Sequence, residues 1–153
     1  MDELALRGME VHDIPRVLEI ERMSFSAPWS ESAFLYEIHK SYAYNRVAVR
    51  ENSIVGYLCV NYILDEGHIM NLAVHPDFRR QGIATVLMRE AIRELRRKGS
   101  DALYLEVRTS NSVAKNFYER FGFGVAGIRK DYYTSPREDA VLMMGRLQET
   151  GKK

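Results

Sequence analysis

Hydrophobic positions alternate with polar ones in some segments of the chain and recur every three or four residues in others. The first pattern is typical of strands and the second of amphipathic helices. Together they predict strands over residues 4–10, 44–50, 53–64, 67–74, 102–107, 123–132 and 140–147. They predict helices over residues 13–25, 30–39, 84–98 and 112–121. Because a run of antiparallel strands precedes strands that alternate with helices, we expect an α/β fold whose mixed sheet is covered by helices.

The length and charge of the chain limit the classes of protein to which it can belong. Its 153 residues fit one domain of ordinary size, so we expect a single domain over 1–147 and a frayed tail over 148–153. The formal net charge of +1 gives no reason to expect a nucleic-acid partner. No apolar segment reaches the length that spans a bilayer. We therefore expect a cytoplasmic protein without a membrane partner.

The single cysteine and the four histidines predict neither a disulfide nor a metal site. Cys59 lies inside the apolar run 54–64, where we expect it to be a core residue, and a single cysteine fits a reducing compartment. The histidines lack the spacing of metal ligands. They are His12, His39, His68 and His75.

A basic glycine turn between a strand and a helix is the strongest local signal. The apolar run 69–74 ends before Pro76, and an amphipathic helix follows the sequence Arg79-Arg80-Gln81-Gly82-Ile83-Ala84. A helix N-terminus leaves backbone N–H groups unpaired and favours anions, while Gly82 lets the main chain approach a phosphate. The alternative is an ordinary basic turn without a ligand.

Two other nucleotide-binding motifs are dismissed, one because of its context and the other because the sequence lacks it. The residues Gly122, Gly124 and Gly127 match the spacing of the dinucleotide fingerprint, but they follow a helix and lead into a strand, which reverses the order that the fingerprint requires. No Walker loop is present, which argues against phosphoryl transfer from ATP.

Several segments together resemble one known family. The sequence Arg79-x-x-Gly82-x-Ala84 resembles the acyl-CoA pyrophosphate loop of the GNAT N-acetyltransferase superfamily. The segments 105–108, Asn111 and 116–123 stand in the order of that family's later motif. Three further segments resemble the RimI-type branch, the ribosomal-protein alanine N-acetyltransferases: Pro28-Trp29-Ser30-Glu31, Tyr132-Tyr133 and Arg137-Glu138-Asp139-Ala140.

The resemblance implies the GNAT fold: a mixed, mostly antiparallel sheet with a bulge that splays one parallel strand pair, flanked by helices. It implies that acetyl-CoA is the cosubstrate and that Asn111 contacts the arm of acetyl-CoA. The pyrophosphate would lie on residues Arg79, Arg80, Gln81, Gly82, Ile83, Ala84 and Thr85, and the pantetheine arm along Leu72, Ala73 and Val74. An amide-bearing arm can pair with exposed strand backbone as an added strand does.

Two residues are candidates for acid–base catalysis of acyl transfer. Glu106 shares a strand face with Tyr104 and Arg108, opposite the apolar positions, so it can serve as the base in a cleft. The alternative is a solvated glutamate paired with Arg108. Tyr118 is the candidate acid for the leaving thiolate, although its helical spacing with Phe121 also fits a packed core aromatic.

The remaining candidates have structural interpretations as well. Asn111 is placed to cap the helix that follows it. Trp29 resembles part of an acceptor-binding loop, but it also stands where a hydrophobic staple would form around the Ser30 cap. Tyr132 and Tyr133 point to opposite faces of an extended strand, so we expect at most one to line the acceptor groove.

The resulting hypothesis is acetyl transfer from acetyl-CoA to a protein N-terminal α-amine, with the N-terminal alanine of a small-subunit ribosomal protein as the expected acceptor. An α-amine has a pKa of about 7.7 to 8.0 against about 10.4 for lysine, so a modest base suffices. The first alternative is an acetyltransferase for lysine side chains or small amines. The second is a non-catalytic acyl-CoA-binding module, which the presence of both Glu106 and Tyr118 disfavours.

Overall fold

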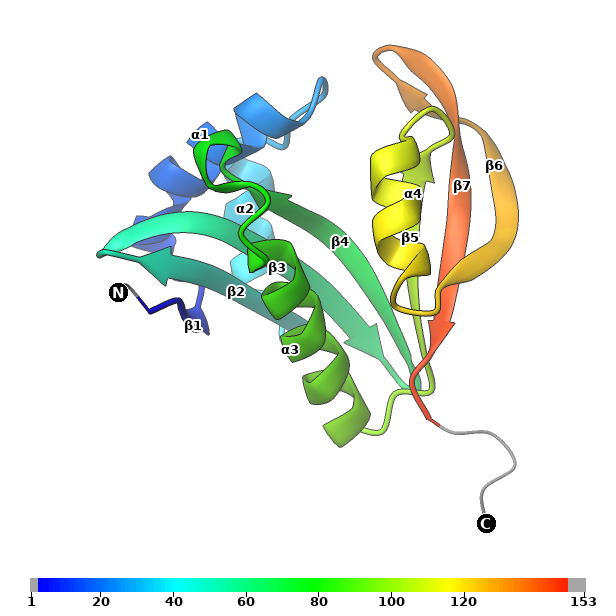
Figure 1. The fold of residues 1–153 in the computed structure, drawn as a ribbon, viewed down its shortest axis with the longest axis horizontal. Helices are drawn as coiled ribbons and strands as arrows, with labels where there is room; N and C mark the ends of the chain where they lie inside the picture. The colour runs from blue at the N-terminus through cyan, green and yellow to red at the C-terminus, as the bar shows by residue number, and fades with distance from the viewer. Residues whose placement is uncertain (1–2, 149–153) are drawn as a thin grey trace.

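A single seven-stranded sheet organises the computed structural model, which describes residues 3–148 (Figure 1). The strand order is β1-β2-β3-β4-β5-β7-β6, and every neighbouring pair is antiparallel except β4 and β5. The strands are β1 (Ala5–Gly8), β2 (Ala43–Arg50), β3 (Ser53–Ile63), β4 (Glu66–Val74), β5 (Ala102–Arg108), β6 (Gly124–Thr134) and β7 (Arg137–Arg146). This is the mixed sheet that the hydrophobic pattern predicts.

Helices cover both faces of the sheet. The short 3-10 helix η1 (Val11–Asp13) leads into α1 (Ile14–Ser24), and α2 (Glu31–Ile38) follows; both α-helices pack on one face through a core that includes Val17, Phe34 and Tyr57. On the other face lie α3 (Ile83–Arg97), which the 3-10 helix η2 (Pro76–Phe78) precedes, and α4 (Ser112–Glu119). The observed bounds differ from the predicted ones by a few residues at most.

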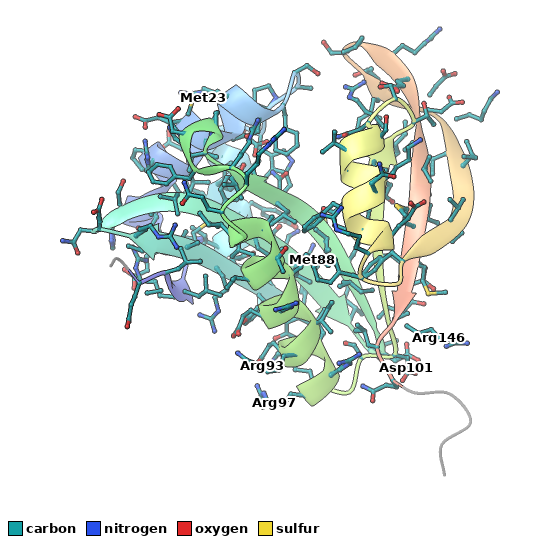
Figure 2. The ribbon with its side chains drawn as sticks, viewed as in Figure 1. Met23, Met88, Arg93, Arg97, Asp101 and Arg146 are labelled. Atoms are coloured by element: carbon teal, nitrogen blue, oxygen red, sulfur yellow. The ribbon has the colours of Figure 1, made fainter. Side chains whose placement is uncertain are left out.

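The apolar face of the amphipathic helix α3 is buried, as its sequence pattern predicts. Leu87, Met88 and Leu95 are fully buried against the sheet. The side chains of Arg93 and Arg97 extend from the outer side of the helix, where each pairs with a glutamate three residues before it (Figure 2). The helix therefore holds the Gly82 turn at a fixed place beside the end of β4.

The two parallel strands separate soon after they pair. Only the first residues of β4 and β5 pair, and His68 with Tyr104 is the last rung of that ladder. Beyond it, β4 has a bulge: Asn71 and Ile69 pair with consecutive residues of β3, which leaves Met70 as the extra residue. A bulge bends its strand and increases the local twist. Residues 69–74 of β4 therefore form no backbone pairs with β5, as the resemblance to the GNAT family implied.

Candidate active site

A cleft of about 460 Å³ opens where β4 and β5 separate. Side chains from the end of α1, from the α1–α2 segment, and from β4, β5, α4 and β6 line it. The candidate residues of the sequence analysis that line this cleft are Trp29, Leu72, Glu106, Asn111, Tyr118, Tyr132 and Tyr133. Segments far apart in the chain thus meet where the pairing of the two parallel strands ends.

Glu106 lies in this cleft with both carboxylate oxygens engaged. Oε1 is 2.6 Å from Nε2 of His68, and Oε2 accepts a hydrogen bond of 2.9 Å from Nε of Arg129. Burial alone would raise the pKa of Glu106, but the hydrogen bond and charge of His68, together with Arg129, lower it below its usual value. Glu106 is therefore an ionised group at neutral pH. The alternative pairing with Arg108 is wrong, because that side chain binds Glu138 instead.

Tyr118 reaches the cleft from α4. Its ring packs among core residues, with the Phe117 and Phe123 rings 5.1 and 6.0 Å away. Among residues 3–148, no hydrogen-bond partner is seen for its hydroxyl, and the residue lines the cleft. Burial raises the pKa of Tyr118 above its ordinary value, so the hydroxyl keeps its proton and can donate a hydrogen bond. The packed ring and the cleft position coexist, as the sequence analysis allowed.

Glu106 and Tyr118 enter the cleft from opposite faces of the sheet. Leu105 and Val107, the neighbours of Glu106 on β5, belong to the same core cluster as Tyr118. Because side chains alternate along a strand, Glu106 points to the other face, where its partner His68 lies. A thioester held between the separated strands would have an acid on one side and a base on the other.

The basic turn before α3 is left-handed at two of its residues. Gly82 has φ of 79° and stands as the N-cap of α3, where it offers no side-chain cap to the first N–H groups of the helix. Arg80 is also left-handed, with φ of 64°. Arg79 donates from Nε to the carbonyl of Val74, and Gln81 accepts from Arg50 Nη1 at 2.6 Å. The turn lies beyond the lining of the cleft, past the end of β4.

The three candidate residues of β4 differ in where their side chains lie. Leu72 lines the cleft. Ala73 is buried in the core beneath α1 and α2, and Val74 in the core beneath α3. The N–H of His75 donates to the carbonyl of Val55, so the alternation of the antiparallel ladder directs the main chain of Ala73 to β3 and that of Leu72 and Val74 to the unpaired β5 side. A ligand on this side would therefore meet the main chain of Leu72 and Val74, and the carbonyl of Val74 also accepts from Arg79.

Asn111 and Trp29 have the structural roles that the sequence predicts. Asn111 caps α4 by accepting a hydrogen bond of 3.0 Å from the backbone N–H of Ala114. Trp29 packs on Phe34 with 4.9 Å between ring centroids, which forms the hydrophobic staple around the Ser30 cap. Both residues also line the cleft.

The expectation for the two tyrosines of β6 is wrong, because both line the cleft. The strand is irregular between Arg129 and Tyr133, and Asp131 has φ of 52°. A left-handed residue interrupts the alternation of an extended strand, so the neighbours Tyr132 and Tyr133 no longer point to opposite faces. Their rings meet edge to face with centroids 5.0 Å apart.

Sequence reasoning missed the residues that hold these groups in place. Glu21 is 1% exposed; it accepts hydrogen bonds from the hydroxyl of Tyr57, from Asn71 Nδ2 at 2.8 Å and from the backbone N–H of Trp29 at 2.9 Å. Burial raises its pKa, although all three hydrogen bonds oppose that shift. Glu21 thus ties the α1–α2 segment to the bulged part of β4. Its i, i+4 spacing from the buried Val17 was the only signal in the sequence.

A second acidic group fixes the turn between β6 and β7. Glu138 accepts hydrogen bonds from the backbone N–H of Ser110 at 2.7 Å and from Thr109 Oγ1 at 3.0 Å, and Arg108 lies 3.2 Å away. The Ser110 hydrogen bonds are the main cause that lowers the pKa of Glu138 to about 2. Arg108 also stacks over Tyr133, 4.3 Å from its ring centre. The loop before α4 is thereby joined to the tyrosine wall of the cleft.

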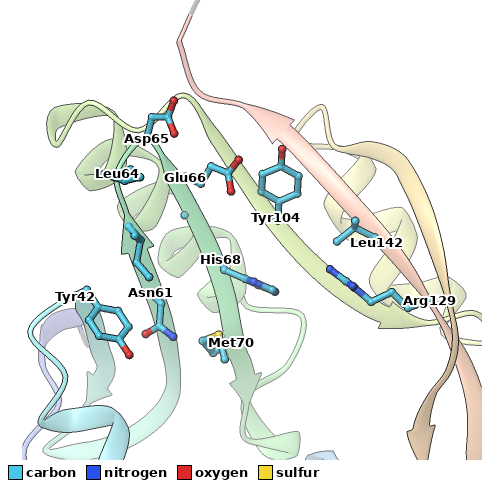
Figure 3. A pocket seen from close by; sticks show the side chains of 12 residues that line it. Tyr42, Asn61, Leu64, Asp65, Glu66, His68, Met70, Tyr104, Arg129 and Leu142 are labelled. Atoms are coloured by element: carbon cyan, nitrogen blue, oxygen red, sulfur yellow. The ribbon is translucent and has the colours of Figure 1, made fainter.

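A second pocket, here called the outer pocket, adjoins the site. It has a volume of about 870 Å³, and its lining includes Tyr42, Asp65, Glu66, His68, Tyr104 and Arg129. Figure 3 shows His68 and Arg129 pointing toward one another across it. Both residues bind Glu106, so this carboxylate separates the outer pocket from the cleft.

Within residues 3–148, no three or more His, Cys, Asp or Glu side chains are grouped so that they could hold a metal ion. None of the helices between residues 3 and 148 is long and apolar enough to cross a membrane. Cys59 is buried, as predicted, and burial raises the pKa of its thiol.

Known proteins resemble this chain in sequence. The model of the acetyltransferase (GNAT) family matches residues 14–123. A Bacillus subtilis (strain 168) protein, provisionally named [ribosomal protein bS18]-alanine N-acetyltransferase, is 37% identical over 146 residues, which are 95% of this chain and 97% of that protein. The Escherichia coli (strain K12) [ribosomal protein bS18]-alanine N-acetyltransferase is 36% identical over 140 residues, 90% of this chain and 94% of that one.

The fold agrees with these sequence matches. The crystal structure of the ribosomal-protein-S18-alanine N-acetyltransferase from Escherichia coli superposes with a TM-score of 0.90 and 33% identity, over 99% of this chain and 98% of that one. In the dismissed dinucleotide motif, Gly122 follows α4, and Gly124 and Gly127 lie in β6, as expected. The chain is therefore an acetyl-CoA-dependent N-acetyltransferase that belongs to the GNAT family.

Proposed function

We propose that this enzyme acetylates the N-terminal alanine of ribosomal protein bS18, and that residues 1–147 act as one catalytic unit in the cytoplasm. The observation that supports acyl transfer most directly is the pair Glu106 and Tyr118 on opposite walls of one cleft. The acceptor is inferred from relatives that match this chain over at least nine-tenths of its length and carry that activity in their names.

Acetyl-CoA would enter along the unpaired part of β4. Its pyrophosphate would bind the N–H groups at the start of α3, where Gly82 leaves room for it and Arg80 adds positive charge. The pantetheine amides would pair with the backbone of residues 72–74, and Asn111 would contact the arm. This path brings the thioester to the point where β4 and β5 separate.

Glu106 would act as the base for the acceptor. An α-ammonium group must lose a proton before its nitrogen can attack the thioester carbon. The new C–N bond forms as the C–S bond breaks, and the second proton of the nitrogen passes to the departing thiolate, which leaves as the thiol of CoA. Glu106 is ionised and faces the side of the sheet opposite to Tyr118. A neutral amine approaching from that side would reach the carbonyl carbon directly.

Tyr118 would stabilise the leaving group. A free thiol has a pKa of about 8.5 and tyrosine about 10, so full proton transfer to the thiolate is uphill. Burial raises the Tyr118 pKa further, which makes complete transfer still less favourable. We infer that its hydroxyl acts mainly as a hydrogen-bond donor to the developing thiolate.

The acceptor would occupy the part of the cleft between Trp29 and the paired rings of Tyr132 and Tyr133. These three aromatic side chains form walls suited to a short extended peptide with a small first residue. Glu21 would hold the Trp29 side of this groove, and Arg108 the Tyr133 side. A groove closed on both sides would present one terminal amine to Glu106.

A CoA-release assay on matched peptides tests this function. One peptide begins with alanine and has a free α-amine, and its control has the same sequence with a blocked α-amine and an internal lysine. We expect CoA release with the first peptide only, because a site built for one amine holds the other out of attack geometry. Equal release from both would favour the lysine acetyltransferase alternative. Acetyl-CoA binding without release from any amine would favour the non-catalytic module.

A further inference from the structure

The outer pocket lies on the sheet face that carries α1 and α2. These helices pack on β2, β3 and β4, and Met70 packs against the edge of their core. Because side chains alternate along a strand, Glu66 shares this face with Met70. Figure 3 shows Asp65, Glu66 and Tyr104 at one end of the pocket and Met70 at the other. The pocket is therefore an open stretch of sheet that begins where the helices end.

The outer pocket adjoins the side of the cleft from which the acceptor would approach. Met70 lines both cavities, and Glu106 shares a sheet face with Tyr104, two residues before it on β5. In the proposed reaction the acceptor amine reaches Glu106 from this face. An acceptor chain that continues beyond its first residue therefore has a cavity of about 870 Å³ beside it.

Two carboxylates of the outer pocket have no partner. Asp65 and Glu66 both line the pocket, and both are exposed. Within residues 3–148, neither side chain forms a hydrogen bond or an ion pair. Because they are neighbours in the chain and line one cavity, they present two negative groups to a ligand that enters it.

The cations near the outer pocket are already paired. Arg129 binds Glu106 at 2.9 Å. Lys40 lies beside the ring of Tyr42 and binds Glu37 at 3.0 Å. A ligand in the pocket would therefore meet unpaired negative charge, and the positive charges around it are neutralised by the protein itself.

We propose that the outer pocket binds a lysine or arginine side chain of the acceptor, downstream of the residue that is acetylated. This inference rests on the proposed function, because it extends the acceptor-binding surface of the same site. Asp65 and Glu66 would attract the positive charge of that side chain. The rings of Tyr42 and Tyr104 also line the pocket, and the face of a tyrosine ring attracts cations.

The length of the strands sets the position of this side chain in the acceptor. Glu66 pairs with Ala102, which stands four residues before Glu106 on β5. Four strand residues span about 13 Å, and an extended peptide advances by about the same distance per residue. A chain whose first nitrogen lies at Glu106 would therefore pass Glu66 close to its fourth residue. We expect the preference for a cation to be strongest at residues three to five of the acceptor.

Matched peptides test this subsite. Each begins with alanine, contains no lysine, and carries either arginine or glutamate at position four of one otherwise neutral sequence. For the parent enzyme we expect kcat/KM to favour the arginine peptide by about tenfold, because charge pairs at an exposed site are individually weak. The preference should fall as the salt concentration rises, since salt screens exposed charges.

A second pair of peptides separates local contact from long-range attraction. Here the arginine or glutamate stands at position ten, beyond the reach of the pocket, and kcat/KM should differ by less than about twofold between the two. An equal preference for arginine at positions four and ten would reflect the overall charge of the enzyme and would overturn the subsite. No preference at any of positions three to five would also overturn it.

Charge reversal in the pocket is the sharper comparison. Glu66→Lys should bring the ratio of kcat/KM for the two position-four peptides to within about twofold of one, since the charge of Asp65 is then offset. The double variant Asp65→Lys, Glu66→Lys should invert the ratio, so that the glutamate peptide is preferred. Glu119→Lys is the matched control for Glu66→Lys, because Glu119 is exposed at the end of α4 and lines neither pocket.

The control makes the same change in net charge and should keep the ratio of the parent. A double variant that still prefers the arginine peptide as the parent does would show that the acceptor does not enter the outer pocket. Because each ratio compares two peptides on one enzyme, a partial loss of folded protein does not alter it. Thermal unfolding of each variant checks that these exposed positions can be replaced without loss of the fold.

The choice of acceptor separates this test from the test of the proposed function. If the parent acetylates lysine in place of the α-amine, the proposed acceptor is wrong, and the same arginine and glutamate substitutions around that lysine decide the subsite. If no peptide is turned over, isothermal titration calorimetry with CoA present gives the ratio of Kd for the two position-four peptides. That ratio should again favour arginine in the parent and glutamate in the double variant, and equal Kd values in the parent would overturn the proposal.

Discussion

Glu106 and Tyr118 line one cleft although they belong to opposite faces of the sheet. The carboxylate of Glu106 is fixed by His68 and Arg129, and the ring of Tyr118 packs against Phe117 and Phe123. This relationship exists because β4 and β5 stop pairing after His68. The separation that leaves β4 backbone unpaired also brings side chains from the two faces of the sheet to one cleft.

Replacing Glu106 tests the base. Glu106→Gln keeps the shape of the side chain but removes its ability to accept a proton, so kcat should fall on the order of a hundredfold or more. The KM for acetyl-CoA should stay close to the parent. Arg129 and His68 remain partly exposed, so the variant should fold. Steady-state kinetics between pH 6 and 9 check this, and a rate within about twofold of the parent throughout would remove Glu106 from the mechanism.

Replacing the Tyr118 hydroxyl tests the acid. Tyr118→Phe keeps the packed ring, and no hydrogen bond from the hydroxyl to residues 3–148 is lost, so the melting temperature should change little. The rate should fall by about tenfold or more because the leaving thiolate loses its donor. Phe117→Leu is the control, since it changes the same aromatic cluster without touching that hydroxyl. A Tyr118→Phe enzyme as fast as the parent would leave Tyr118 a packing residue only.

A matched pair of glycine variants tests the phosphate turn. Gly82 and Gly99 lie just beyond the two ends of α3, both have positive φ, and neither has a neighbour within 4 Å of an added Cβ. Tryptophan at either position should cost about 1–2 kcal/mol in backbone strain. Only Gly82→Trp should also abolish the thermal stabilisation by acetyl-CoA, which is about 2.7 kcal/mol at a hundred times Kd.

Thermal unfolding with and without acetyl-CoA separates the two effects. The Gly99→Trp protein should shift as the parent does, because its substitution lies at the far end of the helix. If Gly82→Trp is stabilised by acetyl-CoA as much as Gly99→Trp, the cosubstrate's phosphates bind elsewhere.

The lowered pKa of Glu138 predicts that the stability of the protein depends on pH. Its hydrogen bonds with Ser110, Arg108 and Thr109 lower its pKa to about 2 from an ordinary value of 4.5. A group whose pKa is lower in the folded state stabilises the protein above its unfolded pKa and loses that effect as the pH falls through the folded pKa. Glu138→Gln should therefore be less stable than the parent at pH 7, and the difference should shrink as the pH falls from 4.5 toward about 2.

Urea unfolding at a series of pH values measures this difference. Glu119→Gln, on the exposed surface of α4, is the control and should unfold as the parent does. A Glu138→Gln protein whose deficit is the same at pH 7 and pH 2.5 would show that its carboxylate is not held as described.

The sequence predicted the elements well because their signals are local. The 3.6-residue pattern of Leu87, Met88 and Leu95 places one face of α3 in the core, and the Asn111 and Ser30 caps mark the starts of α4 and α2. Glu106 and Tyr118 could be located from alternation, helical spacing and family resemblance. Each of these signals depends on residues that are close together in the chain.

The contacts that tune the site come from distant residues. His68 and Glu106 are 38 residues apart, and their contact depends on where the parallel ladder of β4 and β5 ends. Glu21 and Asn71 meet across 50 residues through the bulge of β4. The error over Tyr132 and Tyr133 arose from assuming regular alternation, which a single left-handed residue interrupts. Bulges and ladder ends depend on strand pairing and leave weak traces in local composition.

The central claim is that the enzyme acetylates a terminal α-amine. The most direct measurement is mass spectrometry of one peptide that begins with alanine and also carries an internal lysine, after incubation with acetyl-CoA. We predict a single added acetyl group on the alanine nitrogen, with the lysine unmodified. An acetyl group on the lysine beside a free α-amine would contradict the account.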